Sequence, residues 1–268
     1  MTKVDISILD GVPQTLLIPL MGRALESQKR DGILNDPKSV SIFNQIDYDF
    51  DKFNNPSLQS SLFRTVVRTT IIDHLVLTFF EEQSSATIIE IGCGLNTRFE
   101  RLDNGKIQWF DLDVPEVYNI WKKFFVETDR HHFLATSAFD EDWLRQVKTK
   151  SQGPYFFISE ASVTYFSEQK VKTLFTNLHN YFPRSHYLFD AASPGFLNDQ
   201  KKSSISRKYF NAHYKWFLKD LDTLKTWLPE MKILKSINLE RPDEPFASLY
   251  PQNFIPHKQG AHLNLVQI

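Results

Sequence analysis

The fold is decided by the stretch Ile88-Ile89-Glu90-Ile91-Gly92-Cys93-Gly94-Leu95-Asn96-Thr97-Arg98, where an apolar run ends at two glycines spaced by one residue. A second apolar run, Ile107-Gln108-Trp109-Phe110, ends in Asp111-Leu112-Asp113, about 20 residues after the first glycine, which is the spacing of a ribose-binding acid. Glycines let the backbone approach a ligand closely, and the acid accepts hydrogen bonds from ribose hydroxyls. A buried strand, a glycine turn, a helix and an acid-tipped strand therefore predict a pocket for a nucleoside cofactor.

The composition narrows the class of protein. The chain has 268 residues, of which 41% are hydrophobic, and this is enough for the core of one large domain. A net charge of −1 provides no basic field, so we expect no nucleic-acid partner. No apolar run approaches the length of about 18 residues that spans a membrane, and the first residues lack the apolar region of a secretory signal. The only cysteine, Cys93, favours a reducing compartment, and we expect a cytoplasmic protein without a metal site.

Helical patterns dominate the first third of the chain. Residues 1–56 read as a helical preface, with a helix start at Asp36-Pro37. A second start at Asn55-Pro56-Ser57 opens a long helix, because apolar residues follow at three- and four-residue spacings as far as Phe80. Arg64 and Arg68 lie one turn apart on this helix, either as a solvated basic edge or as contacts for a ligand carboxylate.

Strands alternate with helices from residue 86 onward. We expect strands at residues 86–91, 106–111, 132–136, 155–159 and 186–190, separated by helices at 96–102, 115–127, 140–148 and after Ser167. Residues 203–228 read as further helices, and 231–239 and 262–268 as strands. This alternation predicts an α/β fold with a doubly wound, mostly parallel sheet, to which the final strand adds antiparallel.

Three kinds of ligand compete for the glycine turn. A dinucleotide fold would place a third glycine where Thr97 stands, and a P-loop would require a Gly-Lys-Ser/Thr sequence that is absent. S-adenosylmethionine carries no phosphate, but it needs a glycine turn, a ribose acid, an adenine slot and a partner for its carboxylate. Arg68 or Arg98 supplies that partner in this interpretation, although Arg98 also suits an ion pair with Glu100 or Asp103.

A wider string of residues carries a family resemblance. Residues 92–103 and 109–117 together resemble the leucine carboxyl methyltransferase family, most of all its branch of polyketide O-methyltransferases of the tetracenomycin type. Further agreement lies at residues 13–20, 23–27, 46–50, 68–69 and 159–160, and at Tyr165. The resemblance implies a class I methyltransferase that uses S-adenosylmethionine. It has a Rossmann-like sheet of seven strands and an N-terminal helical lid. In this scheme one domain comprises the lid (1–56), a cofactor-binding core (57–200) and a helical insertion with the last strands (201–268).

The resemblance also implies which residues hold the cofactor. Arg68 matches the arginine that meets the cofactor's carboxylate, and Asp113 matches the acid that holds its ribose, with Asp111 pointing the same way on a strand. The other candidates lie at strand ends, in the glycine turn and in the adenine-side loop: Glu90, Gly92, Gly94, Arg98, Ala138, Phe139 and Glu160, with Arg23 as a weaker match from the lid.

Three positions depart from the family's pattern. Asn96 stands where the family usually has Asp, and Ala161 stands where Gly is common. Ala138 replaces an Asp of the protein-methylating branch, so a polar contact to adenine is not expected there.

The chemistry leaves the acceptor and the base open. Methyl transfer from a sulfonium is an in-line displacement that mainly needs the acceptor held in line and dry. A phenol acceptor needs a general base, whereas a carboxylate does not. The candidate bases are Glu160, Tyr165, His213 and Asp190. We expect the acceptor between the N-terminal helices and residues 209–227, where an apolar ring would meet aromatic side chains: Phe210, Tyr214, Trp216 and Phe217.

The sequence therefore supports three functions in order. The first is an O-methyltransferase acting on a hydroxyl or carboxyl oxygen of a small, aromatic or polyketide-like molecule. The second is a protein C-terminal carboxyl methyltransferase. The third is a cofactor-binding protein without catalytic activity.

Overall fold

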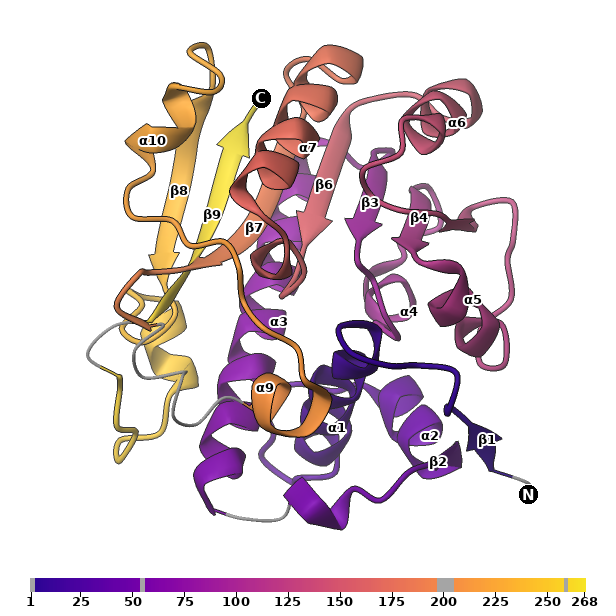
Figure 1. Cartoon of the computed structure of the whole chain (residues 1–268), viewed down its shortest axis with the longest axis vertical. Helices are drawn as coiled ribbons and strands as arrows, with labels where there is room; N and C mark the ends of the chain where they lie inside the picture. Colours follow the sequence, from indigo (N-terminus) through magenta and orange to yellow (C-terminus); the bar gives the residue numbers. More distant parts are fainter. Residues whose placement is uncertain (1–2, 54–55, 197–204, 258–259) are drawn as a thin grey trace.

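A seven-stranded sheet with helices on both faces forms the centre of the molecule (Figure 1). The computed structural model describes residues 3–53, 56–196, 205–257 and 260–268. The strands of the sheet, in chain order, are β3 (Thr87–Ile91), β4 (Gln108–Asp113), β5 (His131–Ala135), β6 (Tyr155–Ser159), β7 (His186–Ala192), β8 (Lys232–Asn238) and β9 (Ala261–Gln267).

The order of the strands creates a switch point in the sheet. Their spatial order is β5-β4-β3-β6-β7-β9-β8, and only β9 runs antiparallel to its neighbours. This confirms the predicted doubly wound, mostly parallel sheet with an antiparallel last strand. The chain winds outward from β3 to β5 and then returns to place β6 on the other side of β3. Ligands of such sheets bind at the carboxyl ends of the strands where the winding reverses.

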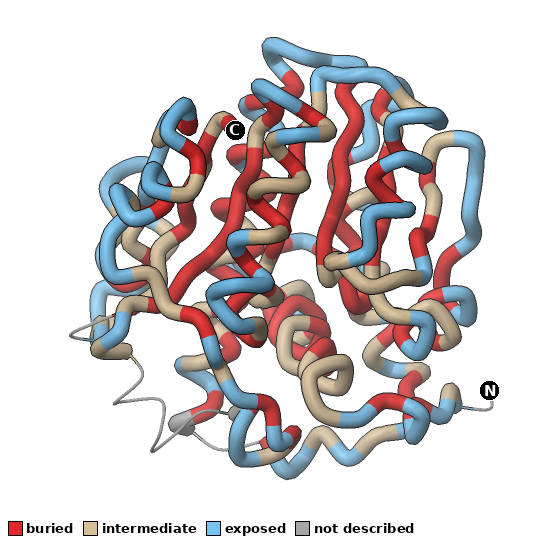
Figure 2. Tube along the Cα trace, turned by 45° about the horizontal axis from the view of Figure 1, so that its top comes forward, coloured by how far each residue is buried: buried red, intermediate tan, exposed pale blue. Residues whose placement is uncertain are grey.

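Each face of the sheet is covered by its own set of helices. On one face, Ile89, Phe110 and Phe157 pack with α6 (Asp142–Lys150) and α7 (Glu168–Tyr181). On the other, Ile88 and Trp109 pack with the long α3 (Pro56–Glu82), and α4 (Arg98–Leu102) lies beside it. The strands are consequently buried along most of their length, which Figure 2 shows as red segments. Burial on both faces explains why β3 and β6 read as continuous apolar runs.

The N-terminal segments gather at the carboxyl end of the parallel strands (Figure 1). They comprise β1 (Val4–Asp5), the 3-10 turn η1 (Pro13–Leu16), α1 (Leu17–Ser27), α2 (Pro37–Gln45), β2 (Ile46–Asp47) and the 3-10 turn η2 (Asp51–Phe53). The segment β1 pairs with β2 in a separate two-stranded parallel sheet. A hydrophobic cluster joins these segments to α5 (Pro115–Trp121) and α9 (Ile205–Phe210). The predicted helical preface therefore covers the edge of the sheet where a ligand would bind.

Two predicted helical segments are wrong in extent. The helix expected over residues 115–127 ends at Trp121, because turns beyond it bury both Phe124 and Phe125, which a continuing helix would point in different directions. The helices expected over 203–228 reduce to α9 and the short α10 (Asp222–Lys225), with positions 203–204 outside the described residues. Between them the backbone bonds to other elements: the amides of Lys215 and Trp216 donate to Thr164 O.

Two 3-10 turns and a membrane search complete the description. The turn η3 (Val163–Tyr165) follows β6, and η4 (Phe246–Leu249) lies in the Pro-rich link before β9. Within the described ranges, we find no helix with the length and apolar character needed to cross a bilayer.

Candidate functional site

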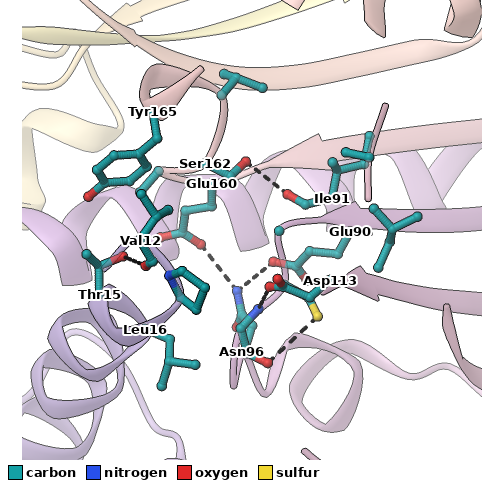
Figure 3. Close-up of a pocket in the computed structure, with 18 of the residues that line it drawn as sticks. Val12, Thr15, Leu16, Glu90, Ile91, Asn96, Asp113, Glu160, Ser162 and Tyr165 are labelled. Atoms are coloured by element: carbon teal, nitrogen blue, oxygen red, sulfur yellow. Dashed lines mark hydrogen bonds between the residues drawn. The ribbon is translucent and has the colours of Figure 1, made fainter. Parts of the chain in front are cut away.

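A cavity of about 300 Å³ lies at the switch point of the sheet. Its walls are the glycine turn after β3, the tip of β4, the loop at residues 136–139 and residues 160–166 after β6. The fourth side is formed by Val12, Thr15, Leu16 and other residues of the N-terminal segment, as Figure 3 shows. The cavity is thus built from the strand ends and is covered by the segment predicted to be a lid.

The glycine turn has a shape that only glycine fits. Gly92 and Gly94 both have positive φ, at 72° and 56°. A Cβ on Gly92 would lie 2.5 Å from Ser162 Cβ, and one on Gly94 would lie 3.0 Å from Leu16 Cβ. The backbone therefore comes close to the β6 loop on one side and to the lid on the other, while the turn itself lines the cavity.

The two acids of β4 have different surroundings. Asp113 lines the cavity, and its carboxylate accepts hydrogen bonds from the amides of Gly94 and Val114, both at 2.8 Å. Burial raises the pKa of Asp113 to about 6. Asp111 lies outside the cavity lining. It accepts hydrogen bonds from Trp109 Nε1 and Trp121 Nε1, both at 3.0 Å, and lies 2.9 Å from His131 Nε2. Of the two acids, only Asp113 faces a ligand in this cavity.

Arg98 is buried beneath the cavity rather than lining it. Its guanidinium contacts three carboxylates: Nε lies 2.7 Å from Asp73 Oδ1, one terminal nitrogen lies 2.5 Å from Glu160 Oε2, and the other bonds to Glu90. The predicted pair with Glu100 or Asp103 does not form; Asp103 binds Arg130 instead. All nitrogens of Arg98 are used by protein carboxylates, so none of them faces a cofactor carboxylate.

Arg68, on α3, lines the cavity beside Glu160. Its Nε lies 3.1 Å from Glu160 Oε1, and its Nη1 lies 3.5 Å from Asp190 Oδ2. Burial opposes ionisation of Glu160, but the positive charges of Arg98 and Arg68 outweigh it and hold the pKa of Glu160 well below its usual range. Arg64, one turn earlier, instead binds Glu240 at 2.9 Å and the carbonyl of Ile255. The structure separates the two arginines into an anchor for the C-terminal region and a cavity residue.

Glu90 is the buried acid at the end of β3, and it too lines the cavity (Figure 3). Its Oε1 accepts hydrogen bonds from Asn96 Nδ2, at 2.6 Å, and from Arg98. Its Oε2 is buried and has no hydrogen-bond partner among the described residues. Burial raises the pKa of Glu90 to about 7, although Arg98 acts against the shift.

The four candidate bases lie in unlike places. Tyr165 lines the cavity, where burial raises the pKa of its phenol well above the usual value. Asp190 is buried behind the cavity and accepts a hydrogen bond from the Ala161 amide at 2.5 Å. His213 is exposed, lies 3.0 Å from Asn211 Oδ1 and does not line the cavity. Glu160 faces the cavity but is held in ion pairs.

The remaining predicted residues divide in the same way. Ala138 and Phe139 line the cavity, with the ring of Phe166 4.6 Å from that of Phe139, and Arg23 lines it from α1. Of the aromatic residues expected around an acceptor, only Tyr214 lines the cavity. Phe210 and Trp216 pack in the hydrophobic clusters instead.

The sequence did not assign a role to several residues that build the site. Ser162 donates a hydrogen bond to Ile91 O at 2.9 Å and thereby fixes the β6 loop against β3. Asn96 bridges the two carboxylates Glu90 and Glu160. Asp73 holds Arg98 from α3. Only Asn96 carried a sequence signal, as a departure from the family's aspartate.

Comparisons with known proteins agree with this arrangement. The family model described as leucine carboxyl methyltransferase matches residues 17–179. The tetracenomycin polyketide synthesis O-methyltransferase TcmP of Streptomyces glaucescens is 26% identical over 239 residues, covering 89% of this chain and 86% of that protein. The S-adenosyl-L-methionine-dependent methyltransferase dpfgK of Gibberella zeae is 27% identical over 244 residues, covering 84% of this chain and 81% of that protein.

Solved structures share the fold at low identity. A DUF574 family protein from Streptomyces avermitilis superposes with a TM-score of 0.63 at 10% identity, covering 92% of this chain and 96% of that chain. Magnesium protoporphyrin IX methyltransferase of Synechocystis, solved with bound SAH, superposes with a TM-score of 0.50 at 12% identity, covering 86% of this chain and 93% of that chain. These two likenesses concern the fold alone.

Proposed function

Since the chain belongs to the leucine carboxyl methyltransferase family and is an S-adenosylmethionine-dependent methyltransferase, we propose that it methylates a hydroxyl or carboxyl oxygen of a small, aromatic or polyketide-like molecule. The observation that carries this proposal is the covered cavity, in which the chain's own N-terminal segment lies over the glycine turn. Further support comes from the likeness to a polyketide O-methyltransferase.

The residues of the cavity fit the cofactor. Gly92 and Gly94 form a turn that no side chain would allow, beside the buried, unpartnered Oε2 of Glu90. In the proposal, Arg68 binds the cofactor's carboxylate and Asp113 accepts hydrogen bonds from its ribose. Ala138, Phe139 and Phe166 form the apolar slot for adenine. Glu160 orients Arg68 through their ion pair. When bound, the cofactor supplies an electrophilic methyl group on a sulfonium.

The acceptor belongs at the lid side of the cavity in this proposal. Val12, Leu16 and Ile18 bring apolar surface from the N-terminal segment, and Tyr165 and Tyr214 face them with ring centroids 5.0 Å apart. Such a lining suits a ring system and keeps water away from the reacting atoms, so that an acceptor oxygen is held in line and dry.

The surroundings of the candidate bases favour an acceptor that ionises without help. Glu160 is bound by Arg68 and Arg98, which lower its pKa and with it its basicity. Tyr165 has a raised pKa and stays a neutral phenol, while Asp190 and His213 lie outside the cavity lining. We therefore propose a carboxylic acid or an acidic phenol as the acceptor, because its oxygen is already anionic near neutral pH.

A labelled-methyl assay on a panel of acceptors tests this function. The panel contains aromatic carboxylic acids, polycyclic phenols of differing pKa, neutral alcohols and peptides with a free C-terminal carboxylate. We expect label on the aromatic acids or acidic phenols and none on the alcohols. Label only on a peptide carboxylate would establish the protein-methylating alternative instead. Binding of S-adenosylhomocysteine without any transfer across the panel would favour the non-catalytic alternative.

A further inference from the structure

Glu90 and Glu160 both face the cavity, but only one of them has capacity left for a ligand. We propose that the free Oε2 of Glu90, rather than Glu160, receives the ammonium group of the cofactor's amino-acid portion. This inference rests on the cofactor and not on the identity of the acceptor. It differs from the role that the family resemblance suggests, in which the acid after the fourth strand of the core lies near the cofactor.

Glu160 has no acceptor site to spare. Its Oε1 accepts from Arg68 Nε at 3.1 Å and from Thr69 Oγ1 at 2.7 Å. Its Oε2 accepts from Arg98 at 2.5 Å and from Asn96 Nδ2 at 3.3 Å. A carboxylate offers about four lone-pair sites, so the protein already uses those of Glu160. An ammonium group could bind there only by displacing one of these donors.

Glu90 presents the opposite situation. Asn96 and Arg98 both bond to its Oε1, which fixes the orientation of the carboxyl group. The residue is 1% exposed, and its Oε2 has no partner among the described residues. A buried acceptor without a partner is uncommon in native proteins and calls for an explanation. Since Glu90 lines the same cavity as Arg68, the two present opposite charges to the zwitterionic end of one ligand.

The charges beneath the cavity also leave room for one cation. The ion pairs that run below it join four arginines to five carboxylates: Arg23, Arg68, Arg98 and Arg101 to Asp36, Asp73, Glu90, Glu160 and Asp190. With every acid ionised, this network lacks one positive charge. A proton on Glu90 supplies it in the free protein, and the ammonium group supplies it in the complex.

The groups around Glu90 determine when that proton is present. Arg98 faces it from α4, Asp111 from β4, Glu160 from beyond β6, and the buried Cys93 thiol from the glycine turn. Burial is the largest influence and raises the pKa of Glu90 to about 7. Near neutral pH the free protein therefore holds a proton on Glu90 in about half of the molecules. Binding of an ammonium group at Oε2 would release it.

Calorimetry on the whole protein tests the assignment without measuring turnover. We would titrate S-adenosylhomocysteine at pH 7 in buffers with different ionisation enthalpies, which gives the number of protons released on binding. The wild type should release about half a proton more than Glu90→Gln, and the variant should bind at least about tenfold more weakly. The Gln side chain keeps an oxygen for Asn96 and Arg98 but presents an NH₂ group to the ligand. Equal proton counts and equal affinities would overturn the proposal.

A second ligand provides a test within the wild type. The analogue of S-adenosylhomocysteine that lacks the amino group should bind more weakly and release less than half of the protons that the parent releases. The loss of affinity on removing the amino group should be large in the wild type and small in Glu90→Gln. If Glu160→Gln, rather than Glu90→Gln, abolishes that difference, the ammonium group binds at Glu160 and the proposal is wrong.

Discussion

At the scale of single residues, Ala161 shows strain that the sequence hinted at. It has a φ of 52°, in the left-handed region, and its amide donates to Asp190 Oδ1 at 2.5 Å. This conformation explains why the family commonly has glycine at the position. Ala161→Gly should therefore stabilise the protein by about 1 kcal/mol in urea denaturation. Ala135→Gly, on the exposed end of β5, should instead destabilise it by about 0.5–1 kcal/mol. A loss of stability in both variants would contradict the strain argument.

Arg68 is the residue at which cofactor recognition can be separated from folding. The proposal gives it the cofactor's carboxylate, while its Nε stays bound to Glu160. Arg68→Ala should weaken S-adenosylhomocysteine by about 2–3 kcal/mol, the range for a charge-assisted hydrogen bond, and should leave adenosine unaffected because that ligand has no carboxylate. Calorimetric titration of both ligands measures the two losses. Equal losses would mean that Arg68 only supports the structure of the cavity.

At the scale of elements, Asp36 joins the lid to the core. It caps α2 by accepting from the Ser39 amide at 2.9 Å. Its second oxygen binds Arg23 of α1 at 3.2 Å and Arg101 of α4 at 2.9 Å. Asp36→Ala would remove a helix cap and leave two buried cations short of a partner. We expect a loss of about 3–5 kcal/mol, the range for breaking a buried ion pair from one side.

A second helix cap provides the matched control for Asp36. Ser167 caps α7 by accepting from the Lys170 amide, lies on the surface and takes no part in the ion network. Ser167→Ala should cost only about 1 kcal/mol in the same denaturation experiment. If the two variants lost the same small amount, the buried ion pairs of Asp36 would contribute nothing to stability.

The elements also show how far sequence patterns reach. The strands β3 and β6 and the helix α3 were predicted nearly to the residue, because burial on one or both faces leaves a periodic signature in the sequence. The segment after α9 was predicted wrongly as helix. Its amides at Lys215 and Trp216 bond to Thr164 O, a partner about fifty positions away in the sequence. Hydrophobic periodicity contains no information about such long-range backbone bonds.

At the scale of the whole molecule, the site was predicted in its outline and not in its interior. The glycine turn and the tip of β4 were found because local spacing specifies them. The different surroundings of Asp111 and Asp113 could not be read from the sequence, since two indole groups and a histidine from elsewhere in the fold surround Asp111. Arg98 was expected to meet a ligand or a neighbour in sequence, yet it binds acids of α3, β3 and the β6 loop.

Glu90 should make the stability of the ligand-free protein depend on pH in a direction opposite to an ordinary ion-paired acid. Its pKa rises from 4.5 to about 7 on folding, so the folded state binds a proton more tightly than the unfolded chain. The stabilisation is fully present below pH 4.5 and is lost as the pH rises through about 7. The full loss amounts to about 3 kcal/mol in the free energy of unfolding.

Comparison with Glu90→Gln isolates this effect, because every other titrating group is common to both proteins. Asp113, with its pKa raised to about 6, adds a loss of the same sign. Glu160, with its lowered pKa, contributes stability that is lost as the pH falls below 4.5. Both contributions cancel in the difference between the two proteins. Urea unfolding at pH 5, 6, 7 and 8 should show the wild type losing stability relative to Glu90→Gln as the pH rises. Parallel curves over this range would mean that Glu90 is ionised throughout, and that no proton waits to be displaced by a ligand.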